Sequence, residues 1–287
     1  CATALDLDVP VARIENVDGA ASTFSTSLPV LHQPLPASSV PGSPDSTNAP
    51  AVLGAIETAV ALTMDRGANA VVTNPIQKES LAKAGFRFSG HTDFLGHLAG
   101  DVATVMMLAT NGLRVVPATV HVGLQEAISS ITPAILVDCA RMTANSLRDD
   151  FGIKAPRLVM TGLNPHAGEG GLFGFEEGLI IAPAIDQLNA EGIDIRGPIA
   201  ADSLFHTAAR ETYDAAICMY HDQALIPIKT LDFEHAVNTT LGLPFVRTSP
   251  DHGTALDIAG KNRANPSSLI AAIGMAQTIA RNREQRT

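Results

Sequence analysis

Hydrophobic positions follow two periods along most of the chain. Residues 51–66 repeat an apolar side chain at every fourth position, which predicts an amphipathic helix. Residues 68–73 (ANAVVT) are almost wholly apolar, which is typical of a short strand covered on both faces of a parallel sheet. Further apolar runs predict strands at 104–108, 114–122, 157–163, 215–220 and 224–228.

Helical patterns lie between several of these runs. Thr132 and Pro133 supply an N-cap and a first-turn proline for a helix that we expect to reach about Asp149. Residues 176–190 predict another helix, and a last one opens at 265–266 and runs to about residue 281. Strands that alternate with helices indicate an α/β fold with a largely parallel sheet.

Residues 33–50 are the only stretch whose composition is typical of a loop. The five prolines of this stretch exclude a regular helix or a central strand. No sharp linker divides the chain, so we expect two domains that share one continuous sheet or a hinge region. The chain opens at Cys1 without a methionine, directly in a short apolar–polar stretch typical of a domain interior. We therefore expect an N-terminal segment to be missing.

Composition and charge narrow the class of protein. Of the 287 residues 46% are hydrophobic and 17% charged, which suits a globular enzyme with a large core. The net charge of −10 argues against a nucleic-acid partner, because no surplus of cations exists to neutralise phosphates. The sequence contains no run of 18 apolar residues, so it predicts no membrane-spanning helix. The three cysteines form no CxxC pair, so we expect free thiols in a reducing cytoplasm.

Three histidines follow the carboxyl ends of predicted strands, namely His121, His166 and His221. In open α/β sheets this edge is where ligands bind, and three imidazoles that meet there could hold a divalent metal with an open position for a substrate. The alternative for each is an ordinary hydrogen-bonded histidine at a strand terminus. No HExxH motif or other local ligand pair strengthens the metal interpretation.

Residues 162–174 hold five glycines, which permit positive φ angles and a close approach of the backbone to a ligand. A plain flexible loop is the alternative, and the spacing is not that of a GxGxxG dinucleotide motif.

Two further parts of the sequence could bind an anion. His91 and Thr92 precede Asp93, which could cap a short helix over 94–99 and create a phosphate site at its N-terminus. In a chain with few cations, a lysine and an arginine after His221 could clamp a phosphate and a carboxylate, with the alternative that each is a surface charge. The residues concerned are Lys229, Asn238 and Arg247.

Six motifs resemble the 4-hydroxythreonine-4-phosphate dehydrogenases of pyridoxal phosphate synthesis. They are TNPIQK (73–78), SGHTDF (89–94), GLNPHAGEGG (162–171), ADSLF (201–205), MYHDQ (219–223) and NTTLGLPFVRTS (238–249). The resemblance runs in order from about residue 51 to the end. It departs at the front, where the glycine-rich opening strand and turn of that family is absent.

A second segment, DHGTALDIAGKNRANP (251–266), resembles the one with which isocitrate and isopropylmalate dehydrogenases hold the adenosine of NAD(P). These resemblances imply a two-domain fold of the isocitrate/isopropylmalate dehydrogenase type, with its active site in the interdomain cleft. We expect one domain to comprise 1–120 with 240–287, and the other 121–239 with the metal ligands and the dimer interface.

The resemblance also implies roles for single residues. It makes His121, His166 and His221 metal ligands. It makes His91, Thr92, Lys229, Asn238 and Arg247 substrate contacts. It places His252, Gly253, Thr254 and Asn265 at the cofactor, although Gly253 could equally be a turn glycine. The family is homodimeric with a site at the subunit interface, so one metal histidine would come from the partner chain.

The chemistry implied is oxidation of a C3 hydroxyl by NAD or NADP, followed by loss of CO2 from a β-keto acid. Asp202 and Asp222 are the candidate proton acceptors, and either could instead orient an imidazole. Three imidazoles favour zinc, while ligand type leaves cobalt, manganese and magnesium open. The leading hypothesis is the vitamin B6 enzyme acting on 4-phosphohydroxy-L-threonine. Alternatives are a related dehydrogenase of 4-phosphoerythronate, 4-phosphothreonate or a cyclic diol carboxylate, and a non-catalytic metal- or phosphate-binding module.

Overall fold

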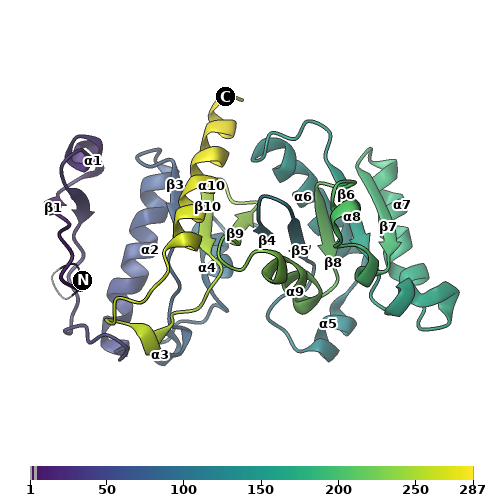
Figure 1. The fold of residues 1–287 in the computed structure, drawn as a ribbon, viewed down its shortest axis with the longest axis horizontal. Helices are drawn as coiled ribbons and strands as arrows, with labels where there is room; N and C mark the ends of the chain where they lie inside the picture. Colours follow the sequence, from purple (N-terminus) through teal and green to yellow (C-terminus); the bar gives the residue numbers. More distant parts are fainter. Residues whose placement is uncertain (1, 3–4, 287) are drawn as a thin grey trace.

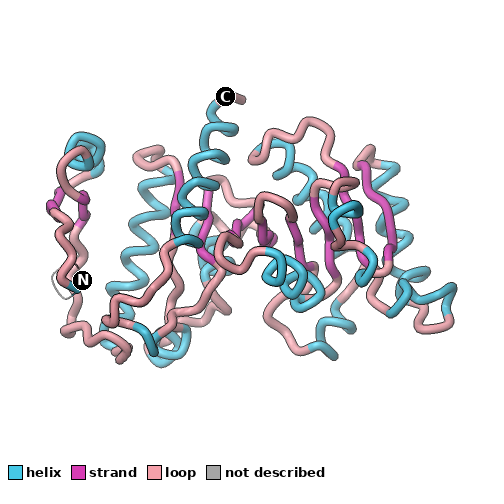
Figure 2. The backbone as a smooth tube through the Cα atoms, viewed as in Figure 1, coloured by secondary structure: helices cyan, strands magenta, loops and turns pink. Residues whose placement is uncertain are grey.

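The structure is a computed structural model that describes residue 2 and residues 5–286, so the expectation about Cys1 lies outside the described residues. Eight strands form one continuous sheet in the order β3-β10-β9-β4-β5-β8-β6-β7, and they stand in a row with helices on both sides (Figures 1 and 2). The strands are β3 (Ala70–Val72), β4 (Val105–Ala109), β5 (Arg114–Pro117), β6 (Arg157–Thr161), β7 (Asp194–Ile199), β8 (Ala215–Cys218), β9 (Val237–Leu241) and β10 (Val246–Pro250).

The sheet is parallel at both ends and antiparallel in its middle. β3 pairs with β10 in parallel, as do β5 with β8, β8 with β6 and β6 with β7. The pairs β10–β9, β9–β4 and β4–β5 are antiparallel. The predicted α/β fold with a mainly parallel sheet is confirmed.

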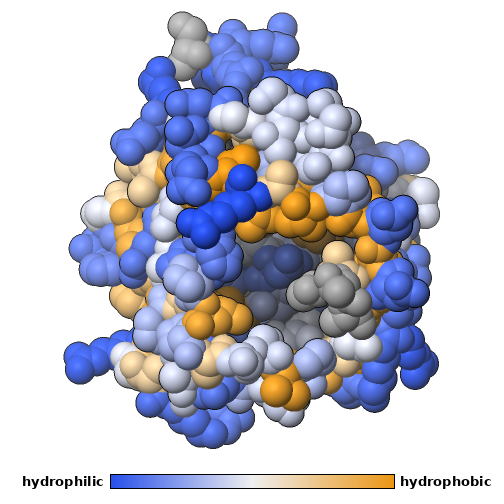
Figure 3. Space-filling view, turned by 90° about the vertical axis from the view of Figure 1, so that its left-hand side faces the viewer, coloured by the Kyte–Doolittle hydropathy of each residue, from blue (hydrophilic) through white to orange (hydrophobic). Residues whose placement is uncertain are grey.

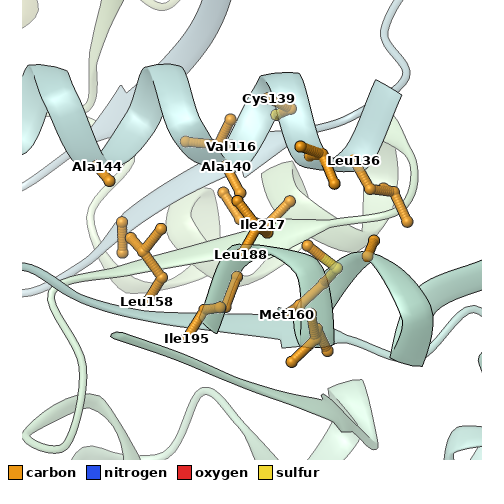
Figure 4. Packing of buried hydrophobic residues seen from close by; sticks show 14 of the residues in the cluster. Val116, Leu136, Cys139, Ala140, Ala144, Leu158, Met160, Leu188, Ile195 and Ile217 are labelled. Atoms are coloured by element: carbon orange, nitrogen blue, oxygen red, sulfur yellow. The ribbon is translucent and has the colours of Figure 1, made fainter. Parts of the chain in front are cut away.

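Side chains of successive strand residues enter two separate cores, which explains the uninterrupted apolar runs in the sequence. On one face Val116, Leu158, Met160 and Ile217 pack under α6 (Pro133–Asp149), as Figure 4 shows. The helix α7 (Ala182–Ala190) lies beside α6 on the same cluster. Thr132 caps α6 by accepting a hydrogen bond from the backbone of Ile135 at 3.3 Å, so the predicted helix start is confirmed.

The opposite face of the same strands packs against α9 (His221–Leu231). The prediction of a strand at 224–228 is therefore wrong, because these residues belong to α9. Ala224, Leu225 and Ile228 turn to the core at helical spacing while Ile226 is exposed. A run of five apolar residues is too short to distinguish a strand from a helix by its period.

Smaller differences concern helix ends. α4 (His91–Leu98) begins directly after Gly90, so Asp93 lies in its first turn and is not the expected cap of a helix over 94–99. The helix predicted at 176–190 consists of a π-helical turn, Glu177–Ile181, followed by α7. The residue at which a helix begins or ends depends on local hydrogen bonds at its cap. The spacing of apolar residues therefore predicts helix ends poorly. The other helices are α2 (Ala49–Met64), α3 (Lys78–Lys83), α5 (Leu124–Ser130), α8 (Thr207–Arg210) and α10 (Ser267–Glu284).

The N-terminal part forms a small separate unit next to α2 (Figure 1). In it β1 (Val11–Ile14) and β2 (Leu28–Leu31) pair in parallel, and α1 (Ala20–Phe24) connects them. Figure 3 looks at this end of the molecule and shows a hollow bordered by hydrophobic residues. Val11, Phe24 and Leu28 of this unit are exposed. The main hydrophobic cores lie on the two faces of the large sheet. Within the described part of the chain, no helix is long and apolar enough to cross a membrane.

Candidate active site

A cavity of about 480 Å³ lies where the ends of several sheet strands meet α4 and α6. It collects residues that are far apart in the sequence and that were predicted for different roles. Its predicted members are the substrate residues His91, Thr92, Asn238 and Arg247, the metal ligand His121, and the cofactor residues His252 and Gly253. Four of the five predicted substrate residues thus share one cavity.

Arg247 gives this cavity a buried positive charge. Its side chain comes from β10, and the residue is only 4% exposed. Nη1 donates to Thr240 Oγ1 at 3.0 Å and Nη2 to Thr73 Oγ1 at 2.8 Å, while Nε has no hydrogen-bond partner. Burial lowers the pKa of Arg247 to about 10, which still leaves it charged at neutral pH. A buried cation held only by hydroxyl groups favours binding of an anion.

His91 stands at the first position of α4 and faces the same cavity. Burial, followed by the positive charges of Arg247 and Lys78, lowers its pKa to about 4. The imidazole is therefore neutral near pH 7 and can serve as a hydrogen-bond donor or acceptor. Asn238 lies nearby on β9, and its Oδ1 is buried without a partner. Unpaired polar atoms in a cavity indicate that a polar ligand completes them.

Several residues that line the cavity were missing from the predicted site, among them Lys78 and Asp251. Lys78, on the first turn of α3, lines the cavity and adds a second positive charge near His91. It closes the TNPIQK motif, which was recognised in the sequence, but only the fold brings it beside α4. Asp251 also lines the cavity, and its Oδ2 lies 3.0 Å from Lys229 Nζ. Burial raises the pKa of Asp251, and the positive charge of Lys229 opposes that shift.

Lys229 does not line the cavity itself. It extends from the last turn of α9 and borders a neighbouring hollow together with His221 and Asp222. Its ammonium group also lies 5.7 Å from the ring centre of Phe233. Asp251 thus connects Lys229 to the cavity that holds the other predicted substrate residues.

His121 and His221 are brought together by the sheet. β5 and β8 are parallel neighbours with Pro117 paired to Cys218, so the loops that follow them leave from the same edge. The two ring centres are 6.1 Å apart, and both side chains line a hollow of about 330 Å³. His121 lines the larger cavity as well, which joins the two spaces.

The surroundings of His121 and the hydrogen bond of His221 both suit metal ligation. Burial and the charges of Lys78 and His221 lower the pKa of His121, so its neutral, ligating form is favoured. Asp222 Oδ1 lies 2.7 Å from His221 Nδ1, which leaves Nε2 as the free nitrogen of that ring. Two imidazoles whose ring centres are 6.1 Å apart fit part of a divalent metal site.

His166 is not part of this pair. Its side chain is 63% exposed, its Nδ1 lies 2.6 Å from Glu169 Oε2, and its ring meets the edge of Phe173. Among residues 2 and 5–286, no group of three or more histidine, cysteine, aspartate or glutamate side chains is placed to hold one metal ion. A single chain therefore brings together two of the three predicted ligands.

The other predicted residues are placed as follows. Asp202 lies in an exposed turn, Ala201–Ser203, and does not line the cavity. Asn265 accepts hydrogen bonds from the backbone and hydroxyl of Ser267 at the start of α10. Thr254 is absent from the cavity lining, whereas a Cβ placed on Gly253 would meet no atom within 4 Å, so open space lies beside its backbone.

Comparison with known proteins gives a consistent result. The family model described as "Pyridoxal phosphate biosynthetic protein PdxA" matches residues 1–276. The chain is 52% identical to the 4-hydroxythreonine-4-phosphate dehydrogenase of Bradyrhizobium diazoefficiens over 281 residues, 96% of this chain and 81% of that protein. It is 55% identical to the enzyme of the same name from Paracoccus denitrificans over 89% of this chain and 81% of the other.

A solved structure supports the fold. The crystal structure of 4-hydroxythreonine-4-phosphate dehydrogenase from Klebsiella pneumoniae superposes with a TM-score of 0.85 at 34% identity, covering 97% of this chain and 86% of the other. The family resemblance and the fold expected from the sequence are therefore confirmed.

Proposed function

Since the chain belongs to the PdxA family of pyridoxal phosphate biosynthetic proteins, we propose that it is a 4-hydroxythreonine-4-phosphate dehydrogenase. It oxidises C3 of 4-phosphohydroxy-L-threonine with NAD or NADP and releases CO2 to give 3-amino-2-oxopropyl phosphate. The observation that carries this proposal is the buried Arg247 guanidinium, whose Nε is unpaired in a cavity shared with His91, Asn238 and His121.

The substrate phosphate is bound at the positive end of this cavity. Arg247 and Lys78 supply charge, and neutral His91 and the hydroxyl of Thr92 supply hydrogen bonds. In a protein with a net charge of −10, this local pair of cations selects for an anion. Asn238 Oδ1 is an acceptor and so suits the substrate's ammonium or hydroxyl group rather than its phosphate.

A divalent metal would be held by His121 and His221 of one protomer together with His166 of the partner subunit. His166 lies on an exposed loop, 162–174, whose neighbours Leu172, Phe173 and Phe175 are also exposed, so this surface can dock on a second copy. Zinc is the metal that three imidazoles favour. When bound, the ion lowers the pKa of the C3 hydroxyl and stabilises negative charge on its oxygen.

The two candidate acids, Asp222 and Asp202, have different roles in this proposal. Asp222 orients His221 through its bond to Nδ1. Asp202 lies in an exposed turn, so its proposed role in proton transfer requires an approach from outside this cavity. NAD or NADP, when bound, would accept the hydride from C3, and a base would accept the proton of the C3 hydroxyl. The bond between C2 and the carboxylate then breaks, and a proton is returned to C2.

The segment 251–266 would hold the cofactor. His252 and Gly253 are at the cavity, and the open space beside Gly253 permits a flat ring or a phosphate to approach the backbone. Thr254 and Asn265 lie further along the same segment and would contact the adenosine part of the cofactor. Asn265 already caps α10, so its contact with a cofactor would come through its free amide group.

The cavity separates two domains, residues 1–120 with 240–287 and residues 121–239. His91 and Arg247 come from the first of these, whereas His121 and His221 come from the second. A cytoplasmic location belongs to the same proposal, since Cys139 and Cys218 are buried free thiols.

The test is a substrate comparison on the purified protein with NAD, NADP and added Zn²⁺ or Co²⁺. NADH formation and CO2 release are measured with 4-phosphohydroxy-L-threonine, 4-phosphoerythronate, 4-phosphothreonate and a cyclic diol carboxylate. We expect the first to have the highest kcat/KM. Faster turnover of any of the others would reject the assignment, and binding of NAD and metal without turnover would favour a non-catalytic module.

A further inference from the structure

The loop that carries His166 has an unusual backbone. The φ angles of His166, Ala167 and Glu169 are 53°, 51° and 45°, and the two glycines between and after them are also positive. Left-handed conformations are rare for residues with a side chain, yet three such residues adopt them here within six successive positions of positive φ, 166–171. Such a segment persists only when the surrounding structure holds it.

Glu177 holds one end of this loop. The residue is 6% exposed, and its Oε1 accepts hydrogen bonds from the backbone N–H groups of Leu163 at 2.8 Å and Asn164 at 2.7 Å. Its Oε2 accepts a third bond from Asn164 Nδ2 at 3.0 Å. A Cβ on Gly168 would lie 2.6 Å from Oε2, so the loop folds closely over this carboxylate. The charge of Glu177 is thus compensated by loop donors that point at it.

Gln223 holds the same loop from the other side. Its Nε2 donates to the carbonyl of Gly162 at 2.8 Å. Its Oε1 accepts from the backbone N–H of Met219 at 2.7 Å and from Thr161 Oγ1 at 2.6 Å. One side chain therefore ties the end of β6, where the loop begins, to the end of β8, two residues before His221.

We propose that Glu177 and Gln223 are positioning residues that fix the left-handed loop and thereby the direction in which His166 is presented to the metal site. This inference rests on the proposed function, because it takes His166 to be a ligand. Neither side chain lines the cavity or the hollow of His121 and His221, so each acts through the loop. The two grip adjacent residues, Gly162 and Leu163, so loss of either leaves the start of the loop held on one side only.

Two variants of nearly unchanged side-chain shape test the positioning role of Glu177 and Gln223. Glu177→Gln weakens the acceptor for Leu163 and Asn164, and Gln223→Glu removes the donor to Gly162 while keeping an acceptor for Met219. The matched controls are Glu57→Gln and Gln277→Glu, which change charge in the same way on the exposed surfaces of α2 and α10. Far-UV circular dichroism and thermal unfolding first establish that each variant is folded.

Hydrogen exchange is measured on the metal-free protein at the amides of residues 162–174. Binding of Co²⁺ alone is measured by calorimetry and by its visible absorption spectrum. We expect at least about tenfold faster exchange at Leu163 and Asn164 in Glu177→Gln, and roughly 10–100-fold weaker Co²⁺ binding in both variants. The controls should match the wild type.

Unchanged exchange in both variants would overturn the proposal, as would faster exchange with unchanged Co²⁺ affinity and an unchanged spectrum. Failure of the proposed function has a different signature. If the wild type and His166→Ala bind Co²⁺ equally well, His166 is not a ligand, and the metal part of both proposals is rejected. The exchange rates would still show whether Glu177 and Gln223 hold the loop.

Discussion

The imidazole rings of His121 and His221 lie with their centres 6.1 Å apart at the adjoining ends of β5 and β8. The parallel pairing of these two strands produces this contact, since each histidine follows the carboxyl end of its own strand. The third predicted ligand, His166, stands on an exposed loop. The described part of one chain thus brings together two of the three predicted ligands.

Subunit complementation tests where the third ligand comes from. His166→Ala and His221→Ala should each abolish turnover while the fold is kept, because the two side chains are 63% and 38% exposed and neither belongs to a hydrophobic core. When the two inactive variants are mixed and allowed to exchange subunits, each heterodimer has one site with all three histidines. In a twofold dimer with random exchange, activity should recover to about one quarter of the wild-type value.

The control for this mixture is His235→Ala, an exposed histidine whose Nδ1 lies 2.8 Å from Asp232, and it should keep full activity alone. If the mixture stays inactive although mass spectrometry shows that heterodimers form, His166 does not act across the interface.

Replacement of Arg247 by methionine should weaken substrate binding without unfolding the protein. A charge-assisted hydrogen bond to an anion is worth about 1.5–3 kcal/mol, so KM should rise on the order of 10–100-fold. The free energy of unfolding should stay near the wild-type value or increase, because an incompletely paired buried charge is replaced by an apolar chain. Steady-state kinetics and urea denaturation check both parts, and an unchanged KM would remove Arg247 from the phosphate site.

Lys78 offers a prediction with a control on the same helix. Lys78→Met should raise KM for the phosphorylated substrate, and the effect should diminish at high salt because the lost contact is electrostatic. Lys83→Met removes a lysine from the far end of α3, where it pairs with Glu79 at 2.7 Å, and should leave KM unchanged. Equal effects of the two substitutions would indicate a general change in net charge rather than a contact.

The pKa of His91 predicts a dependence of stability on pH. Its folded-state pKa of about 4 lies below the ordinary value of 6.5, so between these values the unfolded chain binds a proton that the folded chain does not. The contribution of His91 to the free energy of unfolding is therefore fully present above pH 6.5. It is lost as the pH falls toward 4, by up to about 1.4 kcal/mol per pH unit.

His91→Asn should therefore lose less stability than the wild type when urea denaturation is repeated at pH 7.5 and at pH 4.5. His235→Asn, at an exposed position, should follow the wild type. Parallel curves for the wild type and His91→Asn would show that His91 is not held neutral by its surroundings.

The sequence by itself determined the class of the fold and most strand positions, because burial on both faces of a sheet leaves uninterrupted apolar runs such as Val115-Val116 and Ala216-Ile217. It also identified the family, through motifs that stay recognisable wherever they lie in space. It could not decide between strand and helix at 224–228, since five apolar residues fit both periods and only packing against the sheet selects the helix.

Only the tertiary structure decided which candidates share a site. The strand order β3-β10-β9-β4-β5-β8 sets Arg247, His91, Lys78 and His121 around one cavity and leaves His166 and Asp202 outside it. Gln223 lies in the recognised motif MYHDQ and Glu177 lies in none of the six motifs, but the sequence assigns a role to neither, because each acts through the backbone groups that it reaches. Hydrogen bonds between distant segments depend on the folded path of the chain, and periodicity records only which face of each element is buried.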